Sequence, residues 1–213
     1  MKKILLTFAL KREAEATLQK LDAKPVPHTE KPLWLDGEVP TCYTFSHGWI
    51  LLTDIGSYAA QQAVSAYATQ VDEIWNLGFA GALASTHPLG SLVKISTVAK
   101  YLITPPLDPQ SEECLNKSLP TFSLAPAGTP LVTSDFPIHS TPQKEACRCM
   151  GSLVDMEGYG VAFAASFYKK PCKIWKIVSD FASPEGRTLI RQNRHTLSEL
   201  LADKITSELS FSP

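Results

Sequence analysis

Acidic, glycine and small residues directly follow four apolar segments of the chain, at points where buried strands are expected to end. These points are Ala9–Glu13, Leu77–Ala82, Val154–Gly158 and Val178–Ala182. Ligands of α/β proteins collect at the carboxyl ends of the strands, so these residues are candidates for one site. The acids at three of the points are residue types that can donate or accept a proton.

Each of these features also has a purely structural explanation. The acids of the segment Asp155–Glu157 could stand at a helix N-terminus, where the helix dipole favours them, and Asp180 could begin a turn. Glu13 has charged neighbours and could be a solvated acid on a helix. Gly78 and Gly81 could form a tight turn and nothing more. Taken one at a time, the residues leave both interpretations open.

Other kinds of chemistry lack a matching pattern. The Gly78-x-x-Gly81 turn is not the G-x-G-x-x-G fingerprint, and it lacks the Lys-Ser/Thr of a phosphate-binding P-loop. The five histidines are scattered, and none is paired with a serine or cysteine in a nucleophile motif. Cys147-x-Cys149 does not have the spacing of a zinc knuckle. We therefore expect no acyl-enzyme, no metal and no cofactor.

Expected strands and helices alternate along the chain. Buried strands are expected at 2–10, 73–77, 92–99 and 173–178, short β runs at 33–35, 41–45 and 49–53, and helices at 13–21, 158–168 and 187–209. A further alanine-rich helix follows Ser57, its candidate N-cap. The stretch 105–142 holds eight of the 16 prolines and is expected to be irregular. The pattern predicts a single α/β domain, residues 1–213, with a mixed sheet and helices on both faces.

The composition is that of a globular domain and has no excess of basic residues that would bind a polyanion. Twenty Lys and Arg against 21 Asp and Glu give a net charge of −1, which argues against nucleic acid as a partner. No apolar run reaches the roughly 18 residues of a membrane helix. The run Ile4–Leu10 is short for a secretory signal and lacks a cleavage site. Five scattered cysteines favour free thiols, and we expect a cytoplasmic protein with no membrane partner.

The motifs occur in a characteristic order. Ala9-x-x-x-Glu13 is followed by Asn76-Leu77-Gly78-Phe79-Ala80-Gly81-Ala82-Leu83, Thr133-Ser134-Asp135, Val154-Asp155-Met156-Glu157-Gly158 and Ile177-Val178-Ser179-Asp180. This series resembles the nucleoside phosphorylase/nucleosidase superfamily over nearly the whole chain. It is most similar to the methylthioadenosine/S-adenosylhomocysteine nucleosidases and the futalosine hydrolases, and closest to the latter branch. The resemblance implies an α/β three-layer sandwich whose central mixed sheet is partly barrel-like.

The resemblance also implies a role for each acid. In the family, the acid of the Ser-Asp element protonates the purine leaving group, which points to Asp180 with Ser179 orienting it. The acid of the Met-Glu element holds the ribose hydroxyls, which points to Glu157, with Met156 packed against the sugar. The N-terminal acid, here Glu13, positions and deprotonates the attacking water. Because ribosyl transfer passes through a cation, we expect Glu13 and Glu157 to stay ionised and Asp180 to carry a proton at some stage.

Two segments that are expected to contact the substrate depart from the family pattern. Phe79 precedes Ala80 and Gly81 in the glycine turn, where nucleosidases carry a small hydroxyl residue. A phenyl ring offers phosphate no hydrogen-bond donor, which favours water as the nucleophile. In the base-binding segment a proline separates Phe136 from Ile138 and has no N–H to donate, so one of these two is the expected backbone partner of the base.

Basic residues near Asp180 form the third departure. Lys176 replaces an arginine that the family carries four residues before the catalytic acid, and the two are not interchangeable at a bidentate contact. Arg187, Arg191 and Arg194 share one helical face by their spacing. They form either a solvated basic face or, for Arg187 and Arg191, a site for an anionic group at the 5′ end of a nucleoside.

The sequence therefore predicts hydrolysis of the N-ribosyl bond of a 5′-substituted purine nucleoside, a small-molecule partner. Futalosine and 6-amino-6-deoxyfutalosine, intermediates of menaquinone synthesis, carry a benzoate at that end and are the favoured substrates. Cleavage of methylthioadenosine/S-adenosylhomocysteine is the alternative enzymatic activity. A non-catalytic nucleoside-binding relative also stays open because of Phe79 and Lys176. By analogy with the family, we expect a homodimer.

Overall fold

The computed structural model describes residues 2–26, 42–102 and 119–210. The helices are α1 (Lys11–Lys20), α2 (Ser57–Tyr67), α4 (Thr141–Arg148), α5 (Gly158–Phe167) and α6 (Gly186–Ser210), with a 3-10 turn at Ala68–Gln70. The strands are β1 (Ile4–Phe8), β2 (Lys24–Pro25), β3 (Cys42–Phe45), β4 (Gly48–Leu52), β5 (Glu73–Ala82), β6 (Leu92–Tyr101), β7 (Phe122–Ser123), β8 (Thr129–Ser134), β9 (Leu153–Asp155) and β10 (Cys172–Asp180).

The strands of the described residues form one mixed sheet that closes on itself at one end. Its order is β10-β6-β8-β9-β5-β1-β4-β3-β2, with β7 beside β6. Because β10 also pairs with β5, in parallel, the strands β5, β9, β8, β6 and β10 form a closed barrel. The strands β1, β4, β3 and β2 extend this barrel as an open sheet. The predicted mixed, partly barrel-like sheet is confirmed.

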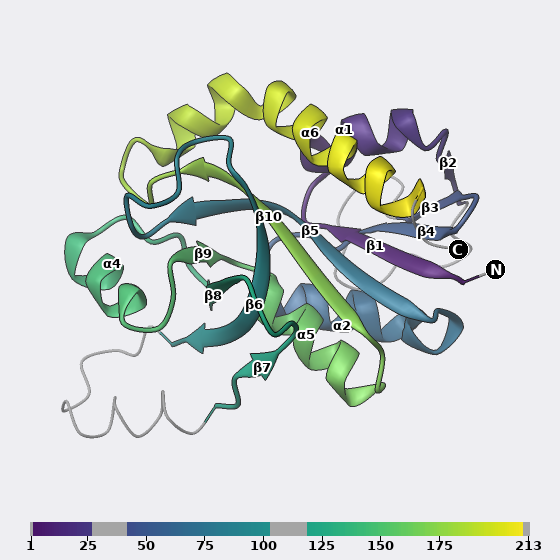
Figure 1. The fold of residues 1–213 in the computed structure, drawn as a ribbon, viewed down its shortest axis with the longest axis horizontal. Helices are drawn as coiled ribbons and strands as arrows, with labels where there is room; N and C mark the ends of the chain where they lie inside the picture. The colour runs from purple at the N-terminus through teal and green to yellow at the C-terminus, as the bar shows by residue number, and fades with distance from the viewer. Residues whose placement is uncertain (1, 27–41, 103–118, 211–213) are drawn as a thin grey trace.

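The first strand shows why the N-terminal run is apolar at almost every position. All five residues of β1 are buried, and alternate side chains point to opposite faces of the sheet. Leu6 and Phe8 pack in a cluster with residues of α1 and α6, whereas Leu5 packs with residues of α2 and α5. Figure 1 shows α1 and α6 on one side of the sheet and α2 and α5 on the other. The three-layer arrangement is therefore also confirmed.

The stretch 105–142 is less irregular than its prolines suggest. Strand β8 lies between β6 and β9, and its last four residues are buried. Pro130 is the second residue of this strand, and Pro142 lies in the first turn of α4. Neither place needs the missing N–H, because strand starts and first helical turns tolerate proline. Residues 105–118, and the β run expected at 33–35, lie outside the described residues.

Helix α2 begins without the expected serine cap. Gly56 is the N-cap residue, with φ +109°, and Ser57 is already the first residue of the helix. The Ser57 hydroxyl is buried and donates to Asp135 Oδ1 at 2.9 Å. The buried Lys100 of β6 donates from its Nζ to both of these side chains. The serine therefore links α2 to β6 and to the end of β8, a contact that local sequence does not reveal.

Candidate active site

A cavity of about 670 Å³ lies at the carboxyl ends of the strands. Its walls come from the start of α1, the ends of β5, β9 and β10, the segment after β8, and the first turns of α6. The cavity collects every site residue expected from the sequence: Glu13, Phe79, Ala80, Gly81, Phe136, Ile138, Met156, Glu157, Ser179, Asp180, Arg187 and Arg191. Residues distant along the chain therefore meet at the edge where α/β proteins bind ligands.

Asp180 ends β10 with both carboxyl oxygens in hydrogen bonds. Ser179 Oγ donates to its Oδ2 at 2.8 Å, and the backbone N–H of Ala182 donates to its Oδ1 at 2.8 Å. Ser179 Oγ also lies 3.3 Å from the carbonyl oxygen of Ala80, a second acceptor for the same hydroxyl proton. The carboxyl group is thus held in one orientation, and the hydroxyl that contacts it has an alternative partner.

Glu13 lies in the first turn of α1 and is buried. Burial raises the pKa of its carboxyl group to about 7, although the positive charges of Lys176 and Arg12 act in the opposite direction. The carboxyl group sits against Gly78: a Cβ at this position would lie 3.0 Å from Glu13 Oε2 and 3.7 Å from Lys176 Nζ. Gly78 lies within β5 rather than in the turn expected from the sequence, because the strand continues to Ala82. Its missing side chain makes room for Glu13 and Lys176.

Glu157 lies just after β9, where its Oε1 accepts a hydrogen bond from the backbone N–H of Gly56 at 3.1 Å. Burial, with the neighbouring Asp155 carboxylate, raises the pKa of Glu157 to about 8, and Lys176 opposes this rise. These raised pKa values run against the expectation that Glu13 and Glu157 both stay fully ionised, because burial disfavours the charged form of each. Residue types alone do not reveal how strongly burial disfavours the charged form.

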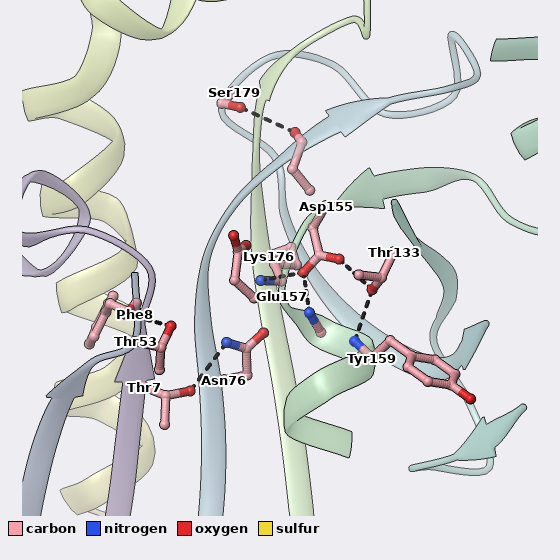
Figure 2. Close-up of polar contacts among 12 residues, drawn as sticks. Thr7, Phe8, Thr53, Asn76, Thr133, Asp155, Glu157, Tyr159, Lys176 and Ser179 are labelled. Atoms are coloured by element: carbon pink, nitrogen blue, oxygen red, sulfur yellow. Dashed lines mark hydrogen bonds and ion pairs between the residues drawn. The ribbon is translucent and has the colours of Figure 1, made fainter. Parts of the chain in front are cut away.

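Lys176 forms a buried ion pair that was not predicted from the sequence. Its Nζ lies 2.8 Å from Asp155 Oδ2, and both side chains are almost completely enclosed. Burial lowers the pKa of Lys176, but Asp155, Glu157 and Glu13 raise it more, so the net direction is upward. Asp155 is fixed in turn by Thr133 Oγ1 at 2.6 Å and the N–H of Gly158 at 2.8 Å. Figure 2 shows Lys176, Asp155, Glu157 and Thr133 gathered between the strands.

The rim of the cavity is basic. Arg187, Arg191 and Arg194 all belong to α6, the helix in which their spacing predicted a shared face, and all three line the cavity and are exposed. Arg12 and His139 also line the cavity, although the sequence did not indicate them as site residues. A signal for Arg12 was available, because it directly precedes Glu13. His139 follows the base-binding segment, and nothing local distinguishes it.

The described residues hold no metal cluster, membrane-spanning helix or disulfide. Among them, no group of three or more histidine, cysteine or acidic side chains is placed to hold a metal ion. None of the helices within these ranges combines the length and the apolar character that a membrane crossing requires. Cys42, Cys147, Cys149 and Cys172, the cysteines of the described ranges, are free thiols.

The closed barrel, the flanking helices and the cavity lined by acids at the strand ends define an α/β protein with a candidate ligand site at the carboxyl edge of its sheet. A family model, that of the phosphorylase superfamily, matches residues 3–207. The chain therefore belongs to the phosphorylase superfamily. No curated protein matches the sequence.

Solved structures with the same fold cover almost all of the chain. A futalosine hydrolase mutant of Helicobacter pylori has a TM-score of 0.80 at 17% identity, over 99% of each chain. The 5′-methylthioadenosine/S-adenosylhomocysteine nucleosidase of the same organism, complexed with a substituted pyrrolidin-3-ol, has a TM-score of 0.79 at 18% identity, over 98% of each chain. The corresponding nucleosidase of Neisseria meningitidis, with methylthio-immucillin-A, has a TM-score of 0.77 at 18% identity, over 96% of this chain and 97% of that one. Similarities at these identities show a common fold.

Proposed function

We propose that the protein is a nucleosidase that hydrolyses the N-ribosyl bond of a 5′-substituted purine nucleoside. The observation that carries the proposal is that Glu13, Glu157 and Asp180, from three distant segments, line one cavity. Its volume, about 670 Å³, lies within the range of pockets for small organic ligands. The solved structures of the same fold, which include nucleosidases and a futalosine hydrolase, support the same reaction class.

Asp180 is proposed to protonate the departing purine. An acid in this role must hold a proton before the bond breaks and give it up as the base leaves. When Asp180 Oδ2 carries the proton, the Ser179 hydroxyl can turn to the carbonyl oxygen of Ala80; when Asp180 is ionised, the hydroxyl can donate to Oδ2. Ser179 thus accommodates both states of the acid without moving the backbone.

Glu13 is proposed to accept the proton of the attacking water. Its pKa of about 7 suits a general base that works near neutral pH. Glu157 is proposed to hold the ribose hydroxyls, with Met156 against the sugar. Both acids, once ionised, would stabilise the positive charge that develops on the ribosyl ring. Phe79 lines the cavity and offers no donor to phosphate, which favours water as the nucleophile.

The basic rim favours substrates with an anionic 5′ substituent. Arg187 and Arg191, in the first turns of α6, can make charge-assisted hydrogen bonds to a carboxylate. We therefore favour futalosine or 6-amino-6-deoxyfutalosine, which would place the protein in menaquinone biosynthesis. The base is proposed to meet the backbone at Phe136 or Ile138. Methylthioadenosine/S-adenosylhomocysteine cleavage is the second candidate, because nucleosidases of that specificity share the fold.

Purine release from the purified protein tests the proposal. Futalosine, 6-amino-6-deoxyfutalosine and methylthioadenosine are compared at equal concentration, with and without inorganic phosphate. We expect release from the two benzoate-bearing nucleosides to be faster and independent of phosphate. Equal or faster turnover of methylthioadenosine would select the second candidate, and phosphate-dependent turnover would indicate a phosphorylase. Binding of adenine analogues without any cleavage would indicate a non-catalytic nucleoside-binding protein.

We further propose that the protein acts as a homodimer in the cytoplasm. The homodimer is proposed by analogy with the family, and the cytoplasm because the scattered cysteines favour free thiols. Sedimentation of the purified protein tests the first, since a dimer of a 23.3 kDa chain is readily distinguished from a monomer. Fractionation of the cells that produce it tests the second.

A further inference from the structure

Lys176 is a charged side chain in a place where charge is costly. It lies within β10, four residues before Asp180, and only 1% of its surface is exposed. Taking an ammonium group out of water costs several kcal/mol unless it is paired and hydrogen-bonded. Here it is paired with Asp155, itself buried. A well-packed apolar pair would hold the barrel at least as well, so stability alone does not account for this pair.

Asp155 is anchored by the fold and fixes the position of Lys176. Its Oδ1 accepts from Thr133 Oγ1, and its Oδ2 accepts from the N–H of Gly158 as well as from Lys176. Thr133 belongs to β8 and Gly158 begins α5, so two elements besides β9 and β10 hold this carboxylate. The ammonium group is therefore held at a defined position, although the lysine side chain is flexible.

Lys176 Nζ also faces the two acids of the proposed reaction. Gly78 has no side chain to separate it from Glu13, because a Cβ there would contact both Glu13 Oε2 and Lys176 Nζ. The charge of Lys176 lowers the pKa of Glu13 and of Glu157, whereas the Glu13 carboxylate raises the pKa of Glu157. One buried positive charge thus lies among the carboxyl groups of Glu13, Asp155 and Glu157.

The other charges around the two acids are placed differently. Arg12 of α1 precedes Glu13 in the chain, but its side chain is exposed. Asp155, the last residue of β9, lies two residues before Glu157, and its negative charge raises the pKa of Glu157. The remaining charged or titratable groups of the cavity wall are His139, Asp180, Arg187, Arg191 and Arg194. The arginines are exposed to solvent, which screens their charge more than that of a buried lysine.

We propose that Lys176, anchored by Asp155, is a positioning residue whose charge keeps Glu13 available as a base and sets the pH range in which it acts. The inference rests on the proposed nucleosidase function for its catalytic readout. It assigns Lys176 an action through Glu13 and Glu157 rather than a contact with the substrate. Arginine and methionine at this position should therefore behave differently, although both are long side chains.

The pH profile of kcat/KM tests this in Lys176→Met and in the conservative Lys176→Arg. We expect the acidic limb of Lys176→Met to move to higher pH by roughly one to two pH units, because both acids lose an attractive charge. Lys176→Arg should keep the limb near that of the wild type. A drop in kcat/KM by the same factor at every pH in Lys176→Met would overturn the proposal, since that is what a purely structural role predicts.

A second variant and a second readout keep the test independent of activity. In Asp155→Asn, Glu157 loses a neighbouring negative charge while Lys176 keeps its positive charge. The carbon-13 carboxyl resonances of Glu157 should then titrate at lower pH than in the wild type, whereas in Lys176→Met those of Glu13 and Glu157 should titrate at higher pH. Unchanged midpoints in both variants would contradict the role of Lys176. If the wild-type protein cleaves no nucleoside but the two variants show these opposite shifts, only the proposed function is refuted.

Discussion

Gly186, the first residue of α6, lies directly against the carboxyl group of Asp180. A Cβ at position 186 would be 2.9 Å from Asp180 Oδ1, and on the other side a Cβ at Gly81 would be 3.0 Å from the same oxygen. Two glycines thus enclose the acid between β5 and the start of α6. The first turns of α6 also place Arg187 and Arg191 at the cavity wall. The contact between Gly186 and Asp180 therefore links the proposed acid to the helix that bears the basic rim.

Gly186→Ala should therefore impair the proposed reaction more than it impairs folding. The added methyl group must displace either Asp180 or the first turn of α6, and overpacking of this kind costs about 1–3 kcal/mol. We expect kcat for purine release to fall at least tenfold, because the acid loses its position. Steady-state kinetics and thermal unfolding measure the two effects. Thr196→Ala, on the exposed side of α6, is the control, and a Gly186→Ala protein with normal kcat would contradict the contact's importance.

Asp180→Asn and Ser179→Ala should differ in severity. Loss of a general acid costs about two to four orders of magnitude, so Asp180→Asn should lower kcat at least a hundredfold. Ser179→Ala removes one of the two hydrogen bonds of the carboxyl group, while the N–H of Ala182 still holds Oδ1. We expect an intermediate loss of roughly fivefold, which corresponds to about 1 kcal/mol for one hydrogen bond. Equal losses in both variants would indicate that Ser179 is itself essential to proton transfer.

The raised pKa values of Glu13 and Glu157 predict how stability depends on pH. A carboxyl group whose pKa is higher in the folded protein binds its proton more tightly there, so folding is favoured while it stays protonated. This stabilisation is complete below about pH 4.5 and is lost as pH rises through about 7 for Glu13 and about 8 for Glu157. We expect the melting temperature to fall between pH 5 and pH 8.5.

Glu157→Gln provides the matched variant for this measurement. It removes one of the two ionisations while keeping the size of the side chain, so the melting temperature should fall less steeply over the same range. Glu73, whose pKa is lowered by Lys2 and Lys173 against the effect of burial, contributes in the opposite sense, but only at more acidic pH. A wild-type melting temperature that rises from pH 5 to pH 8.5 would refute the predicted ionisation of the two acids.

Arg187→Ala and Arg191→Ala should separate substrates by their 5′ groups. A hydrogen bond to a charged group contributes about 1.5–3 kcal/mol, so losing one should raise KM for futalosine by roughly 10- to 100-fold. The KM for methylthioadenosine, which has no 5′ charge, should hardly change. Arg148→Ala is the control, because Arg148 is exposed and pairs with Glu145 on α4, away from the cavity wall. Equal effects on both substrates would favour a role for the arginines in holding α6.

Local patterns were enough to predict the layers of the fold and the strands that lead to the site. The continuous apolar run of β1 indicated a strand buried on both faces, and the acids after β9 and β10 marked the edge where the cavity lies. These features are visible in the sequence because they depend on neighbours along the chain. Proline content misled where Pro130 and Pro142 occupy positions that need no N–H.

The sequence by itself determined which residue types reach the carboxyl end of the sheet, since the places of the strands along the chain follow from hydrophobic periodicity. Only the tertiary structure decided that Lys176 pairs with Asp155, that Ser57 contacts Asp135 rather than capping α2, and that burial disfavours the charged forms of Glu13 and Glu157. The reason is that ion pairing and desolvation depend on distances and enclosure in space. Neither is encoded in the spacing of residues along one strand or helix.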